Sequence, residues 1–195
     1  MPCAAVTAWH ALCAAAPLLP GMTVLLQGGG GVSVFALQFA KLFGARVIII
    51  SSSPERCAIL KTLGADEAID YRAQPDWNLA VRNLTGGAGA DLTIDIGGAE
   101  TMQRSLAATR IGGRLAPVGL LTGRPNAASF VGASSVDVTT IRVGSRQDFE
   151  AMNRAIDFHK IRPVIDSRYA FAQLPDALRH LKTGRHLGKI VVGFD

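Results

Sequence analysis

Thr23–Leu42 reads TVLLQGGGGVSVFALQFAKL, and this stretch decides the fold. The apolar run Thr23–Gln27 predicts a buried β-strand, and the apolar periodicity of Val32–Leu42 predicts a helix that Gly44 ends. Four consecutive glycines separate the two segments. Glycines let a chain turn sharply from strand to helix and approach a phosphate closely, and the N–H groups at the helix start then stabilise the anion. The stretch therefore predicts a phosphate-binding turn.

Strand-like and helix-like segments alternate along most of the chain. The β-branched run Arg46–Ser51 predicts a strand buried on both faces, and Ser53 and Pro54 predict the cap and first residue of the next helix. The other expected strands are Glu67–Tyr71, Asp91–Ile96, Gly113–Val118 and Asp137–Val143; the expected helices are Pro54–Leu63, Asp76–Thr85, Glu100–Ala108 and Arg146–His159, with a longer connection at Leu121–Ser135. This alternation predicts an α/β fold, a Rossmann-type doubly wound parallel sheet with helices on both faces.

The two ends of the chain differ from this pattern. Ala4–Ala16 is an apolar helix with no strand before it, and Pro17 ends it. After Arg162 the sequence predicts a strand around Ala170 and Phe171, a helix at Pro175–Thr183 and a strand at Lys189–Phe194.

Composition and charge exclude several classes of protein. The net charge is +5, but the basic residues are scattered and aromatics make up only 6%, which argues against nucleic-acid binding. No apolar run approaches the roughly 18 residues of a membrane span, and no basic start of a signal peptide is present. Three cysteines without a C-x-x-C pair predict neither disulfides nor structural zinc, and they fit a cytoplasmic location.

The glycine turn fits a dinucleotide better than a plain flexible turn. From Gly28 the pattern is G-x-G-x-x-S, in which Ser33 replaces the third glycine of the dinucleotide pattern. The second strand ends in Ser51-Ser52-Ser53, followed by Arg56, where an NAD-preferring site usually has Asp or Glu. Hydroxyls and a guanidinium favour the 2′-phosphate of NADP. The serines also fit a simple helix cap, and NAD remains the alternative cofactor.

Several further stretches together resemble the medium-chain dehydrogenase/reductase family of zinc-type alcohol dehydrogenases and quinone oxidoreductases. They are Pro2–Trp9, Pro20-Gly21, Gln27–Ser33, Leu63–Asp66, Leu84–Gly87, Gly112–Arg114 and Gly188–Val191. Gly144–Phe149 is most similar to bacterial NAD(P)-dependent alcohol dehydrogenases. The resemblance covers essentially the whole chain from Pro2 onward.

The resemblance implies a set of cofactor contacts. It places Gly28, Gly30, Gly31 and Val32 at the pyrophosphate, Ser51, Ser52 and Arg56 at the adenosine ribose, Tyr71 near the adenine, and Thr7, Val118, Gly119 and Leu120 along the nicotinamide. It also places a basic residue, Lys189, near the cofactor; a solvated strand end explains Lys189 equally well.

The resemblance also implies a domain division. Residues 20–161 would form the nucleotide-binding domain, while the connector helix in 1–19 and the return segment 162–195 would belong to a catalytic domain that is mostly missing. We therefore expect a truncated gene product or a fragment, with catalytic residues that the sequence leaves unknown.

Zinc is not expected in this chain. Cys3 resembles a ligand position of the zinc-dependent members, but a catalytic zinc needs three protein ligands. The spacing of the histidines does not supply the other two. His10 is expected in the connector helix, and His180 and His186 on the surface.

Two functions remain open. In the first, the chain is the cofactor half of an oxidoreductase that moves a hydride between NADPH and an alcohol, aldehyde or quinone, and it is inactive alone. In the second, it is a non-catalytic nucleotide-binding module or a degenerate relative. The edge strand expected at Asp137–Val143 also predicts a homodimer through the sheet edge.

Overall fold

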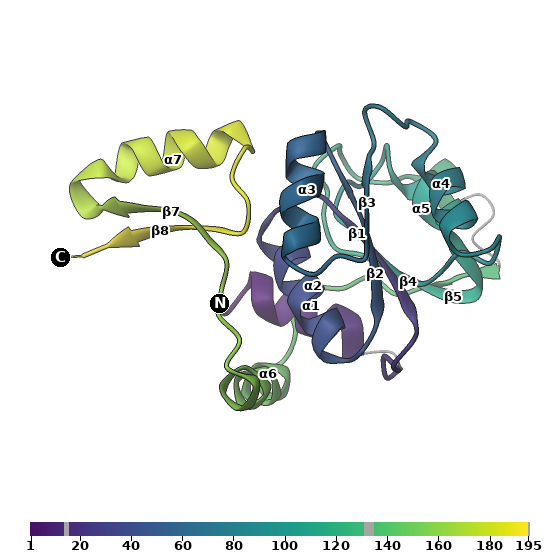
Figure 1. Ribbon diagram of the computed structural model, residues 1–195, viewed down its shortest axis with the longest axis horizontal. Coiled ribbons are helices and arrows are strands. Elements are labelled where there is room, and N and C mark those ends of the chain that lie inside the picture. The colour runs from purple at the N-terminus through teal and green to yellow at the C-terminus, as the bar shows by residue number, and fades with distance from the viewer. Residues whose placement is uncertain (14–15, 131–134, 195) are drawn as a thin grey trace.

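Six parallel strands form the central sheet of the protein. The structure, a computed structural model, describes residues 1–13, 16–130 and 135–194. The strands are β1 (Thr23–Gln27), β2 (Arg46–Ser51), β3 (Glu67–Asp70), β4 (Ala90–Asp95), β5 (Thr109–Pro117) and β6 (Asp137–Val138), in the order β3-β2-β1-β4-β5-β6 (Figure 1). The chain leaves β1 in one direction and returns on its other side as β4. Since ligands of such sheets bind at the carboxyl ends of the strands where the order reverses, the expected crevice lies between β1 and β4.

Helices cover both faces of this sheet. The helices of the chain are α1 (Ala4–Cys13), α2 (Gly31–Leu42), α3 (Pro54–Thr62), α4 (Trp77–Leu84), α5 (Met102–Ala108), α6 (Arg146–His159) and α7 (Leu174–Thr183). Of these, α7 lies apart from the six-stranded sheet (Figure 1). Alternate strand residues point to opposite faces, so Val24 and Leu26 pack with α1 and α2, whereas Leu25 packs with α4. The predicted doubly wound α/β fold is confirmed.

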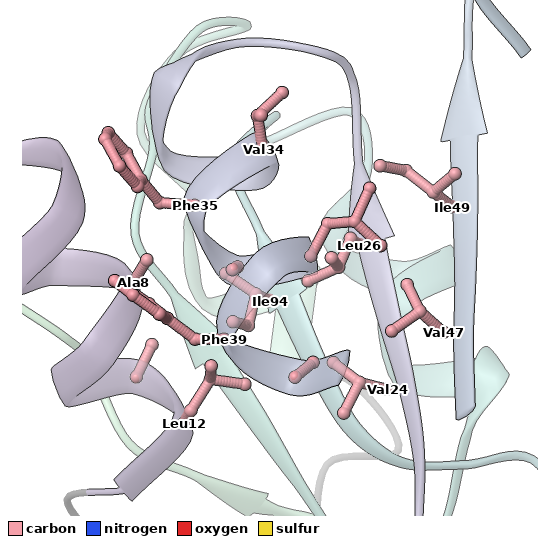
Figure 2. Close-up of a cluster of buried hydrophobic side chains, with 14 of the residues drawn as sticks. Ala8, Leu12, Val24, Leu26, Val34, Phe35, Phe39, Val47, Ile49 and Ile94 are labelled. Atoms are coloured by element: carbon pink, nitrogen blue, oxygen red, sulfur yellow. The ribbon is translucent and has the colours of Figure 1, made fainter. Parts of the chain in front are cut away.

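The larger core cluster joins the connector helix to the glycine-turn helix (Figure 2). Phe39 of α2 is fully buried, and its ring meets Trp9 of α1 edge-on with centroids 5.3 Å apart. Leu12 and Ala8 of α1 are also fully buried beside it. The apolar contact explains why α1, which no strand precedes, is held firmly against α2.

Several expected element bounds need correction. The strand expected at Asp137–Val143 is wrong in length, because β6 contains only Asp137–Val138. Its neighbour β5 ends at Pro117, which has no N–H to continue the ladder. β5 itself begins at Thr109, before the expected Gly113. Residues 14–15 of the helix expected at Ala4–Ala16 and residues 131–134 of the connection expected at Leu121–Ser135 lie outside the described residues.

The C-terminal segment forms a small unit of its own beside the main sheet (Figure 1). Strands β7 (Ile165–Ala170) and β8 (Lys189–Gly193) pair in parallel, and α7 connects them. The Gly188 N–H donates to the Gly29 carbonyl at 2.9 Å, which fastens this unit to the glycine turn. In the described part of the chain, no helix is long and apolar enough to cross a membrane.

Candidate nucleotide-binding site

The glycine turn leaves the start of α2 open to an anion. Gly28 has φ 69°, a left-handed conformation that other residues rarely adopt, and its N–H donates to the Ile50 carbonyl at 2.7 Å. Gly30 is the N-cap of α2 and supplies no side-chain cap. Ser33, at the position of the missing third glycine, is buried and donates its hydroxyl proton to the Gln27 carbonyl. The predicted replacement by a small residue therefore keeps strand and helix together.

Lys189 lies directly over this helix start. Its Nζ is 2.9 Å from the place where a Cβ on Gly31 would lie. The ammonium group and the amino end of α2 thus present positive charge at the same point. This placement favours the cofactor-side interpretation of Lys189 over a solvated strand end.

Arg56 is at the turn, but its guanidinium is already engaged. Nη1 donates to the Arg185 carbonyl at 2.6 Å and Nη2 to the His186 carbonyl at 3.2 Å. Nη2 is also 2.9 Å from the place of a Cβ on Gly29. Arg56 Nε is buried and has no hydrogen-bond partner within residues 1–13, 16–130 and 135–194. The side chain therefore ties the return segment to the glycine turn in addition to facing the site.

The three serines after β2 divide their roles. Ser53 alone caps α3, accepting a hydrogen bond from the Arg56 N–H at 3.4 Å, and its hydroxyl lowers the pKa of Glu55. Ser51 is 1% exposed, and its Oγ has no hydrogen-bond partner in the described structure. Ser52 is half-buried. The cap interpretation and the ribose interpretation are thus compatible, because the cap uses only Ser53.

A cavity of about 430 Å³ opens at the carboxyl ends of β1, β2 and β4. Gln27 and Gly28 form its floor next to the glycine turn, and Tyr71, Trp77 and Ile96 are among its walls. Tyr71 is 38% exposed, and its N–H donates to the Ser51 carbonyl at 2.9 Å. The apolar and aromatic walls suit a flat heterocycle.

The residues expected along the nicotinamide are placed in two ways. Val118 and Gly119 follow β5 and donate their N–H groups to the Asp95 carbonyl at 2.8 and 3.1 Å, while Leu120 is 52% exposed. Thr7 is buried in α1, and its hydroxyl donates to the Cys3 carbonyl at 2.9 Å. The structure holds Val118 and Gly119 against the end of β4, but neither they nor Leu120 nor Thr7 are among the residues that line the cavity.

The comparison with known families decides the relationship. The family model of zinc-binding dehydrogenases matches residues 31–157. The chain belongs to this family. The matched range holds α2, the serine turn and the loops after β4 and β5, whereas Gly28, Gly30 and Lys189 lie outside it.

Solved structures of this family and its neighbours superpose on the zinc-binding dehydrogenase chain over nearly its whole length. A Sinorhizobium meliloti protein of alcohol dehydrogenase type has a TM-score of 0.90 at 41% identity and covers 99% of this chain, which spans 57% of it. An NAD-dependent alcohol dehydrogenase has a TM-score of 0.89 at 33% identity, and the match covers 100% of this chain and 57% of that structure. A mycobacterial protein in complex with NADPH has a TM-score of 0.82 at 30% identity, and the match covers 96% of this chain and 61% of that structure. Two curated relatives are likewise spanned over only 59% and 56% of their length.

Metal ligands do not converge in the described part of this chain. Cys3 is exposed, and no group of three or more His, Cys, Asp or Glu residues that could hold a metal occurs in residues 1–13, 16–130 and 135–194. His10 lies in α1 as expected and pairs with Asp148 at 3.0 Å.

His180 and His186 were expected on the surface, and the structure places them partly exposed in the return segment. Both are half-buried, and His180 Nδ1 is 3.1 Å from the Tyr169 hydroxyl. Burial lowers the pKa of His186, and the cations Arg56 and Lys189 lower it further. The cause is the tight packing of the return segment, which the local sequence does not reveal.

Sequence reasoning also missed Asp95 and its neighbours at the end of β4. Asp95, Gln27 and Ser105 are buried and form a hydrogen-bonded network beneath the crevice. The available signal was a carboxylate that ends the apolar strand DLTID, since a charged residue in such a place is seldom buried without partners.

Proposed function

We propose that this chain binds NADP(H) at the carboxyl edge of its sheet, as the cofactor half of an oxidoreductase that moves a hydride between NADPH and an alcohol, aldehyde or quinone. The observation that carries the proposal is the open amino end of α2 beneath Lys189, where glycines leave the helix N–H groups free of side-chain caps. A helix dipole, free N–H groups and a cation together form a pyrophosphate site.

We place the remaining parts of the cofactor on the residues that the family resemblance implies. The pyrophosphate contacts Gly28, Gly30, Gly31, Val32 and Lys189; the ribose phosphate contacts Ser51, Ser52 and Arg56; the adenine enters the cavity beside Tyr71; and the nicotinamide lies along Val118, Gly119 and Leu120, with Thr7 behind it. The strand order places the end of β2 and the loop after β5 on opposite sides of the β1–β4 crevice, the arrangement across which folds of this kind bind a dinucleotide.

The end of β2 supports NADP over NAD. Ser51 offers a buried hydroxyl without a partner in the described residues, and no carboxylate follows until Glu55, which lies in the first turn of α3. A carboxylate at Ser51 or Ser52 would repel a 2′-phosphate, whereas hydroxyls donate to it. The neighbour solved with NADPH supports this choice, and the NAD-dependent neighbour makes NADH the required comparison.

The chemistry of the proposed reaction belongs to the nicotinamide, which supplies or accepts the hydride when bound. The chain itself binds the pyrophosphate and the 2′-phosphate, orients the ring and holds the loop after β5 against β4. Substrate binding would need a further domain. We assign residues 20–161 to nucleotide binding, and the connector helix and the return segment 162–195 to contacts with such a domain.

Two finer assignments accompany the proposal. The edge strand β6 pairs with β5 on one side only in the described sheet, and we propose that its other side pairs with a second copy. Sedimentation showing a monomer at high protein concentration would contradict the dimer. We also assign the protein to the cytoplasm, where its three free cysteines would stay reduced.

Calorimetric titration of the chain with NADPH and, separately, NADH tests the proposal. We expect both to bind and NADPH to bind more tightly. Tighter binding of NADH would keep the dinucleotide site and refute the 2′-phosphate assignment of Ser51, Ser52 and Arg56. Absence of binding to either would refute the proposed function of this chain.

A further inference from the structure

Asp95 is a fully buried carboxylate at the carboxyl end of β4. Its Oδ2 accepts hydrogen bonds from Gln27 Nε2 at 3.0 Å and from Ser105 Oγ at 2.5 Å. Its Oδ1 accepts from the Gly98 N–H at 2.9 Å and from Thr101 Oγ1 at 3.0 Å. All four donors are neutral groups. Because burying an ionised group without compensation is costly, the four bonds indicate a site built around this one side chain.

The same network fixes the backbone of the two loops that enclose the crevice. We call residues 96–101, after β4, the first loop, and residues 118–123, after β5, the second loop. Gln27 Oε1 accepts the N–H groups of Ile96 and Gly97 at 3.2 Å each. The Asp95 carbonyl accepts the N–H groups that begin the second loop, at 2.8 and 3.1 Å.

Hydrogen bonds also join the second loop to the first loop. Thr122 donates its N–H to the Gly97 carbonyl at 2.8 Å, and Thr122 Oγ1 accepts from the Glu100 N–H at 3.0 Å. A Cβ on Gly98 would lie 3.1 Å from Leu120 Cα, so the two backbones are in direct contact. A shift of the first loop would therefore move the second loop as well.

We propose that Asp95 is a positioning residue for the nucleotide crevice, which it shapes by holding the first loop, and through it the second loop, from beneath. The inference rests on the proposed function, because it assigns a role within the same site. Ile96 and Gly97 of the first loop line the cavity. Ile96 also reaches the glycine turn, because its Cδ1 lies 3.5 Å from the position that a Cβ on Gly28 would occupy. Asp95 itself is covered by protein and acts through these neighbours.

A carboxylate is needed because both of its oxygens face donors. Asparagine has nearly the same shape but accepts on one side only, so its NH₂ group would face either the Gly98 and Thr101 donors or the Gln27 and Ser105 donors. The D95N variant therefore keeps the packing and releases one side of the network.

Asp91 provides a matched control on the same strand. It lies at the amino end of β4, away from the crevice, and accepts from the Thr23 N–H and from Arg110 Nε, each at 2.7 Å. D91N thus removes a similar carboxylate network without touching either loop. Ser105→Ala offers a milder version of the test, because Ser105 lies within α5 and contributes one bond to Asp95.

The experiment combines peptide-resolved hydrogen exchange of the free chain with NADPH titration. For D95N we expect faster exchange in both loops and roughly tenfold weaker NADPH binding, for S105A a smaller change of the same kind, and for D91N a lower Tm with unchanged loops and affinity. Unchanged exchange in the loops of D95N, or equal loss of affinity in D91N, would overturn the inference. If the unaltered chain did not bind NADPH, the proposed function would fail, whereas the exchange data would still decide the role of Asp95.

Discussion

Replacing Lys189 by methionine removes the cation from the amino end of α2 and keeps the length of the side chain. Lys189 is half-buried and its Nζ lies over Gly31, where the pyrophosphate is proposed to bind. A hydrogen bond between charged groups contributes about 1.5–3 kcal/mol. Because partial exposure favours the lower part of this range, and 1.4 kcal/mol corresponds to a tenfold change, we expect NADPH binding to weaken about 10- to 30-fold.

Calorimetric titration of K189M at low salt measures this loss. Lys182→Met is the matched control, because it removes the same charge from an exposed position on α7 of the same C-terminal unit. We expect K182M to bind within about twofold of the unaltered chain, and added salt to weaken K189M less than the unaltered chain. Equal affinity of K189M and K182M would refute the placement of the pyrophosphate.

Three further predictions follow from the same structure. Gly31→Val should weaken NADPH binding with unchanged circular dichroism, because its side chain would displace the Lys189 ammonium group from the start of α2. Phe39→Ala should lower the free energy of unfolding, measured by urea titration, by about 3–5 kcal/mol, because Phe39 is fully buried. The control Phe158→Ala should lower it by less than about 0.5 kcal/mol, because Phe158 is 79% exposed. Burial alone would raise the pKa of Asp148, but hydrogen bonds from Ser145 lower it below its ordinary value of 3.8. The carboxylate therefore stabilises the fold above pH 3.8, and this stabilisation is lost as the pH falls below 3.8. The Tm of the unaltered chain should show this loss, whereas the Tm of D148N should not.

The parts of the fold that local signals specify could be predicted from the sequence. The bounds of β1, β2 and α6 agree with the expected Thr23–Gln27, Arg46–Ser51 and Arg146–His159. An apolar run defines β1, and a mostly β-branched run defines β2. Ser145 and Asp148 form a capping box that defines the start of α6.

The contacts between distant segments could not be predicted in this way. Arg56 and Arg185 are 129 residues apart in the chain. The sequence therefore predicted that the Arg56 guanidinium faces a phosphate, but not that it donates hydrogen bonds to the return segment. Asp95 and Gln27 are 68 residues apart, and only the sheet order makes β4 the neighbour of β1. The length of β6 depended in the same way on Pro117 of the adjacent strand.

The most direct test of the dinucleotide site is an amide-resolved NMR titration of the chain with NADPH. We expect the largest chemical-shift changes at Gly28–Val32, at Ser51 and Ser52, and in residues 118–120, with smaller changes at Lys189. Saturating changes confined to other surfaces, or no changes at Gly28–Val32, would contradict the claim that the glycine turn binds the cofactor.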